Sequence, residues 1–74
     1  MSFVETTDRL MANNVGLREI ADALGVSYST VRATRLPAES SSHRKPPVGW
    51  EKAMAKLARE RGGELLKVAE ELER

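Results

Sequence analysis

The sequence contains no cysteine, a single histidine and only three aromatic residues among 74. Without thiols the chain can form neither disulfides nor thiolate metal sites. One histidine and few clustered carboxylates also leave little from which an active site is built. No apolar run approaches the roughly 18–20 residues of a membrane span, and no charged and apolar leader precedes a cleavage site. We therefore expect a cytoplasmic protein that is not an enzyme, with no metal or other cofactor and no membrane partner.

Length and charge set two further limits. A chain of 74 residues has room for one small core, and it buries only about 60–65% of its unfolded surface. Association into a homo-oligomer is therefore expected. Twelve Lys and Arg against eleven Asp and Glu give a net charge of +1. This excludes a histone-like or ribosomal-type protein, but not a nucleic-acid binder, whose charge needs only to cluster on one face.

The chain divides into three segments by composition. Residues 1–36 alternate apolar and polar residues with helical spacing, residues 37–49 are rich in turn formers, and residues 50–74 are dominated by strong helix formers. No alternating strand pattern is present. The sequence predicts an all-α fold of four to five helices in a single domain.

Three short helices are expected before the turn-rich segment, at about Phe3–Asn13, Leu17–Leu24 and Tyr28–Arg35. Apolar residues recur at i, i+3 or i+4 and i+7 along the first two, which defines one buried face on each. Helix starts and stops are marked by capping residues and helix breakers. These end signals are Ser2 with Glu5, Gly16, Gly25, Ser27 and Pro37.

The second and third helices meet through a turn centred on Gly25, which predicts a crossing of roughly 90–120° and a helix-turn-helix. Ala21 is small where the helices approach, and Val31 points inward. The other side of the third helix carries polar or small residues, and stability gives no reason for Arg32 there. A rigid helix of this kind fits the major groove of DNA. Its outward stripe consists of Ser29, Arg32, Ala33 and Leu36.

The run Glu-Ile-Ala-x-x-Leu-Gly-Val-Ser-x-x-Thr-Val-Arg over residues 19–32 resembles the helix-turn-helix of Cro/C1-type (Xre-like) transcriptional regulators of bacteria and phages. With its flanking residues the resemblance covers about a quarter of the chain. The chain also resembles the very small autoregulators of phage and mobile-element operons, including anti-CRISPR-associated ones. Thr34 departs from the family, which usually has a larger apolar residue there, and this leaves the end of the third helix open.

The resemblance implies a set of DNA contacts. Arg32 would reach into the groove, where a bidentate bond to guanine is the commonest specific contact. Arg18 and Thr30 would contact phosphates. As alternatives, Tyr28 covers the turn and Thr30 is an ordinary helix residue. The implied set comprises Arg18, Ser27, Tyr28, Ser29, Thr30 and Arg32.

Basic residues concentrate on the third helix and the loop after it. Residues 27–47 contain four basic residues and one acidic residue, whereas residues 48–74 contain six of each. Binding that weakens with salt is therefore expected. The loop either follows the DNA backbone as a flexible arm or is a solvated linker. Its lone His43 has no partner for metal binding or catalysis. The four basic residues, all predicted to contact DNA, are Arg32, Arg35, Arg44 and Lys45.

The C-terminal segment carries a near-heptad apolar stripe, the spacing that lets two helices pack along a shared seam. Its members are Trp50, Met54, Leu57, Leu65, Val68 and Leu72, with Arg61 as the one polar position. The first three can close the core. Gly62 and Gly63 predict a break or a bend. We expect residues 63–73 to form a homodimer interface through Leu65, Leu66, Val68, Ala69 and Leu72.

Together these features predict a dimeric, sequence-specific regulator that binds double-stranded DNA at an inverted-repeat operator and is associated with the nucleoid. Repression of a small phage or mobile-element operon is the simplest mechanism, since no room remains for an activation domain or a small-molecule effector site. Two alternatives stay open. One is a recombination or excision accessory factor, and the other is a helical interaction module such as an antitoxin.

Overall fold

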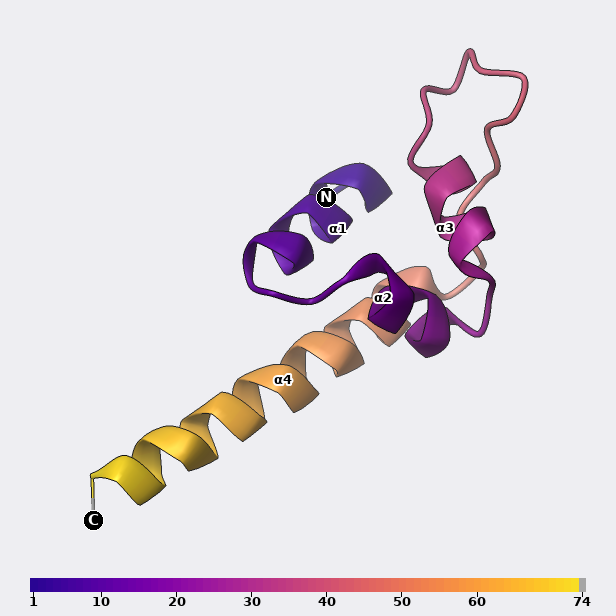
Figure 1. Cartoon of the computed structure of the whole chain (residues 1–74). Helices are drawn as coiled ribbons and strands as arrows, with labels where there is room; N and C mark the ends of the chain where they lie inside the picture. Colours follow the sequence, from indigo (N-terminus) through magenta and orange to yellow (C-terminus); the bar gives the residue numbers. More distant parts are fainter. Residues whose placement is uncertain (74) are drawn as a thin grey trace.

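The computed structural model describes residues 1–73 and contains α1 (Phe3–Ala12), α2 (Leu17–Leu24), α3 (Tyr28–Thr34) and α4 (Trp50–Leu72). Since no described residue lies in a strand, the all-α prediction is confirmed. The first three helices gather around the start of α4, whose second half extends away from them (Figure 1). The molecule is accordingly elongated, with extents of 54 × 20 × 19 Å. Residue 74, the last of the predicted C-terminal segment, lies outside the described residues.

The helix ends follow the capping residues closely. The backbone N–H of Glu5 donates to Ser2 Oγ and that of Thr30 donates to Ser27 Oγ, both at 3.1 Å. These bonds satisfy N–H groups that have no partner within a helix. Gly16 is the N-cap of α2, as predicted, and its backbone is extended. Both α1 and α3 stop one residue earlier than expected.

A small apolar core joins all four helices. Phe3 of α1 meets Trp50 of α4 edge to face, with ring centroids 5.2 Å apart. The predicted closure of the core by the first half of α4 is confirmed, because Met54 and Leu57 are buried. The buried apolar residues are Phe3, Val15, Ile20, Ala21, Val31, Met54 and Leu57.

Two threonines belong to the same interior. Thr7 and Thr34 are buried, and each hydroxyl donates to the carbonyl oxygen four residues earlier, Phe3 at 3.0 Å and Thr30 at 2.9 Å. With its hydroxyl satisfied by the backbone, a threonine can be buried at little cost. Thr34 thus closes α3 onto the core in place of the larger apolar residue, and the helix ends at this position.

The expected break at the paired glycines is wrong, because α4 runs as one helix from Trp50 to Leu72. Its ribbon shows no kink at this point either (Figure 1). Each glycine costs about 1 kcal/mol relative to alanine, but neither forbids helical dihedral angles. The residues on both sides are strong helix formers, and ending the helix here would leave several backbone N–H and C=O groups without a helical partner. Continuing the helix is therefore cheaper than ending it.

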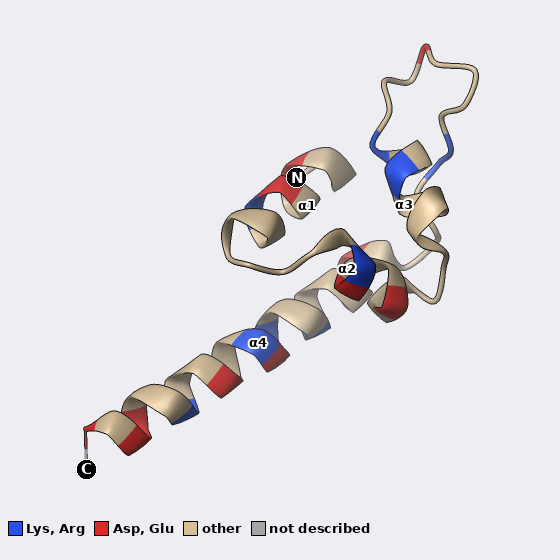
Figure 2. Ribbon diagram, in the orientation of Figure 1, with Lys and Arg blue, Asp and Glu red and all other residues tan. Residues whose placement is uncertain are grey.

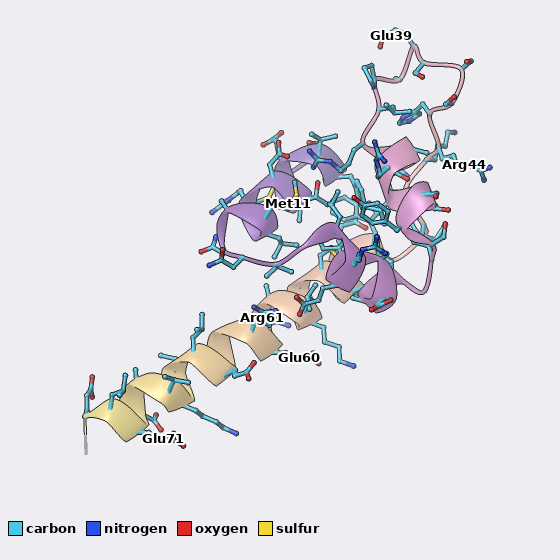
Figure 3. The ribbon with its side chains drawn as sticks, in the orientation of Figure 1. Met11, Glu39, Arg44, Glu60, Arg61 and Glu71 are labelled. Atoms are coloured by element: carbon cyan, nitrogen blue, oxygen red, sulfur yellow. The ribbon has the colours of Figure 1, made fainter. Side chains whose placement is uncertain are left out.

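An ion pair fixes α4 against α2. Arg61 Nη1 lies 2.5 Å from Glu19 Oε1 and 2.6 Å from Oε2. The hydrogen bond with Glu19, and then its charge, raise the pKa of the Arg61 guanidinium above its ordinary value. Figure 3 shows Arg61 at the midpoint of α4. This pairing explains the single polar position in the apolar stripe.

Candidate nucleic-acid interface

The turn between α2 and α3 is held by backbone geometry and by the core. Gly25 has φ of 70°, a conformation that residues with a Cβ seldom adopt. The N–H of Val26 donates to Ala21 O at 3.0 Å, which closes the end of α2. Ile20 on α2 and Val31 on α3 are almost completely buried. The turn and the shared core therefore define the orientation of α3 relative to α2.

The outward face of α3 is open to solvent. Ser29 and Arg32 are exposed, Ala33 is half-buried, and the next residue along this face, Leu36, is exposed. These four residues line a shallow surface depression. The predicted outward stripe is thus present, and α4 leaves Ser29 and Arg32 uncovered.

Tyr28 lies between two arginines on this side of the molecule. The guanidinium carbon of Arg18, at the start of α2, is 4.7 Å from the centroid of its ring, and that of Arg32 is 5.9 Å away. Both distances are within the range of cation–π attraction. The half-buried ring therefore holds one arginine from each helix beside the outward face. We call these three residues the Arg–Tyr–Arg cluster.

Ser27 and Thr30 have a local structural role. Besides the capping bond, their hydroxyl oxygens lie 2.9 Å apart. Ser27 is exposed and Thr30 is half-buried. Both hydroxyls therefore define the start of α3, and contact with DNA from either remains a prediction.

Arg35 faces α1, away from the outward stripe. Its Nη2 donates to Asp8 Oδ1 at 2.7 Å, and its Nη1 donates to the hydroxyl of Thr7. Only 23% of its side chain is exposed. These hydrogen bonds from Arg35 join α3 to α1 and compete with the predicted contact of Arg35 with DNA. Arg35 is therefore not part of the proposed contact set.

The loop between α3 and α4 folds back on α3. The N–H of Arg44 donates to Ala33 O at 3.3 Å, and Nδ1 of His43 lies 2.8 Å from Leu36 O. A polar hollow forms between α3 and the loop, with Ser29, Ser42 and Arg44 among its lining residues. Arg44 itself extends outward from the returning limb of the loop (Figure 3). Because His43 and Arg44 bond to the end of α3, the loop is attached to the helix at these two residues and is not a flexible arm there.

Positive charge gathers around the outward face of α3. Figure 2 shows basic residues at the start of α2, on α3 and on the adjacent limb of the loop. Arg18, Arg32, Arg44 and Lys45 are exposed, and none of the four makes an ion pair within residues 1–73. Glu39 is the one acidic residue of the loop and lies at its far tip (Figure 3). The face is thus suited to a polyanion.

The five residues predicted for a dimer interface lie on the part of α4 that leaves the body (Figure 1). Leu65 and Leu66 are each 66% exposed, and Leu72 is 82% exposed. Val68 and Ala69 are exposed as well. These side chains therefore lie outside the core of the chain, in agreement with the sequence analysis.

Comparisons with protein-family models, curated proteins and solved structures find no match to this chain. Within residues 1–73, no helix combines the length and the apolar character needed to cross a membrane. The same residues bring together no group of three or more His, Cys, Asp or Glu side chains suited to a metal ion. The geometry of α2, α3 and the loop therefore carries the functional argument.

Proposed function

We propose that the protein is a sequence-specific regulator that binds double-stranded DNA by placing α3 in the major groove. The observation that carries the proposal is the exposure of Ser29 and Arg32 on a helix whose orientation the core fixes. An α-helix fits the width of the major groove, where each base pair presents a distinct pattern of donors and acceptors. A binding role, not catalysis, follows from this surface.

The basic residues divide into two groups by position. Arg32 lies on the outward face and is placed to donate two bonds to guanine O6 and N7. Arg18, Arg44 and Lys45 flank that face and are placed to contact phosphates, which fix the register of the protein on the duplex. Three phosphate contacts give a slope of about −3 for log K against log salt at each half-site.

The protein acts as a dimer in this proposal, through the exposed apolar half of α4. A two-fold dimer presents two copies of α3 about one DNA turn apart, roughly 34 Å, which matches an inverted repeat. Bound at a promoter, such a dimer represses a small operon of a phage or mobile element by occlusion. Its place in the cell is then the nucleoid.

Replacing Arg32 by alanine tests the proposal. Loss of one bidentate base contact costs about 1–3 kcal/mol, or roughly 5- to 150-fold in affinity. Lys56→Ala is the control, because Lys56 is also an exposed basic residue but lies on α4. Fluorescence anisotropy with an operator selected from random duplex DNA should show the loss of affinity for Arg32→Ala only. Equal affinity of both variants and the parent chain would contradict the proposal.

Two other functions use parts of the same surface. A recombination or excision factor would use the same face of α3, and footprinting would place it at an attachment site instead of a promoter. The exposed leucines of α4 favour an interaction module such as an antitoxin. In that case Arg32→Ala leaves partner binding intact, and the parent chain selects no DNA sequence.

A further inference from the structure

The chain exposes more surface than a compact protein of its mass. A monomer of 8.2 kDa is expected to expose about 4,500 Å². The observed area is 5621 Å², so about 1,100 Å² is in excess of that expectation. A standard interface buries about 800 Å² on each partner. The excess is therefore comparable to the area that each partner of a standard interface buries.

A second open apolar feature lies beside the exposed leucines. A groove of about 480 Å³ runs between α1 and the first half of α4. Its floor is formed by Leu10, Trp50, Met54, Ala55 and Ala58, while Arg9 and Glu51 belong to its polar part. Because its floor is apolar, the groove suits an apolar helix face better than a polar ligand.

The groove and the exposed leucines lie on one continuous side of α4. From Met54 through Ala58 to Leu65 and Leu72 the steps are 4, 7 and 7 residues, which return to one face of a helix. Between the two features lies Gly62, where an added Cβ would meet no atom within 4 Å. The midpoint of α4 is therefore smooth and open to a second helix.

The charge of α4 favours an antiparallel arrangement of two copies. Residues 50–61 carry a net charge of +2 and residues 62–72 a net charge of −2. The helix dipole adds positive potential at the N-terminus and negative potential at the C-terminus. A parallel pair would place acidic half on acidic half and leave both grooves empty. An antiparallel pair places opposite charges together and covers groove and leucines at once.

We propose that two copies of the chain pair through antiparallel α4 helices that cross near Gly62, with residues 62–72 of each copy seated in the α1–α4 groove of the other. Leu72 of the partner subunit then lies near Glu51, and Leu65 of the partner subunit near Ala58. This pairing specifies the dimer of the proposed function, but it does not depend on DNA binding.

The pairing also sets the spacing of the two bodies. Full overlap of two 23-residue helices separates their first residues by about 33 Å along the pair, at about 1.5 Å per residue. In Figure 1, α3 lies at the end of the molecule where α4 begins. This separation of the two helix starts is close to the length of one DNA turn, roughly 34 Å.

Disulfide formation tests the orientation directly, since the chain has no native cysteine. In the proposed pair the two copies of residue 72 are roughly 30 Å apart, whereas a disulfide needs Cα atoms within about 7 Å. Leu72→Cys alone should therefore stay unlinked, while an equimolar mixture of Leu72→Cys and Glu51→Cys chains links quickly. Lys56→Cys, on the opposite side of α4, is the control partner and should not link. A fast homodisulfide of Leu72→Cys would overturn the proposal.

Sedimentation equilibrium tests the pairing itself. The parent chain should be a dimer at 100 µM, and Leu65→Glu should be a folded monomer, because Leu65 is 66% exposed within one chain. Lys67→Glu introduces the same carboxylate on another side of α4 and should remain dimeric. A monomeric parent chain would overturn the pairing while leaving contacts of α3 with a single half-site intact. A dimer that selects no DNA would instead overturn the proposed function alone.

Discussion

Replacing Tyr28 by leucine should weaken operator binding without unfolding the chain. Leucine keeps an apolar cover over the turn, but it removes the ring that lies 4.7 Å from the Arg18 guanidinium and 5.9 Å from that of Arg32. Both arginines then gain rotamer freedom in the unbound protein, and binding must order them again.

The size of this effect follows from the number of side chains released. Ordering one long side chain at an interface costs about 0.5–1.5 kcal/mol. For Arg18 and Arg32 together the cost is about 1–3 kcal/mol, which corresponds to a roughly 5- to 150-fold loss of affinity. Tyr28→Phe retains the ring, and its affinity should stay within about threefold of the parent chain.

Anisotropy titrations at fixed salt measure the effect, and circular dichroism confirms that each variant is folded. A double-mutant cycle with Arg18→Ala should show that the two losses are not additive, because both changes act on the same cluster. A folded Tyr28→Leu variant with parental affinity would refute the preorganisation argument. A loss of the same size in Tyr28→Phe would assign the effect to the hydroxyl instead.

Other changes test the fold and the site. Ile20→Ala, at a fully buried position, should cost about 2–5 kcal/mol in urea unfolding; a smaller cost would contradict its central place in the core. Gly25→Ala, at φ of 70°, should lower the free energy of unfolding by about 1 kcal/mol. Gly63→Ala, inside a helix with open space around it, should raise it by about 0.5–1 kcal/mol. Melting temperatures that shift in the same direction for both variants would contradict these two assignments. Asp8→Asn should lower stability by at most about 1 kcal/mol and leave DNA affinity unchanged; stronger binding would return Arg35 to the contact set.

Local signals were sufficient to predict most of the fold. The predicted bounds of α2 are correct, because Gly16 and Gly25 directly flank the helix whose ends they cap. The start of α3 was also correct, since Ser27 caps it through a bond to Thr30, three residues later. Such contacts depend on nearby residues and are therefore visible in a one-dimensional pattern.

Contacts between distant residues could not be predicted in the same way. Glu19 and Arg61 are 42 positions apart, and Arg35 and Asp8 are 27 apart. The identity of these residues does not indicate their partners, so the sequence predicts a DNA contact for Arg35 and leaves Arg61 an exception in an apolar stripe. A signal did exist at position 61, because a charge within a core-facing stripe calls for a partner.

The candidate site shows the same division. The exposure of Ser29 and Arg32 followed from the inward position of Val31 on a short helix. The stacking of Arg18 on Tyr28 did not, because it depends on how α2 and α3 cross. The break predicted at the paired glycines of α4 is wrong for another reason. A low helix propensity adds a free-energy cost at a position, but it does not by itself end a helix there.

Selection of bound sequences from random duplex DNA, at near-physiological salt, tests the central claim most directly. If α3 enters the major groove of DNA and two copies act together, the selected pool should converge on an inverted repeat. Its half-site centres should lie about 10–10.5 base pairs apart. A pool that remains indistinguishable from the starting library would contradict the claim that this helix recognises DNA.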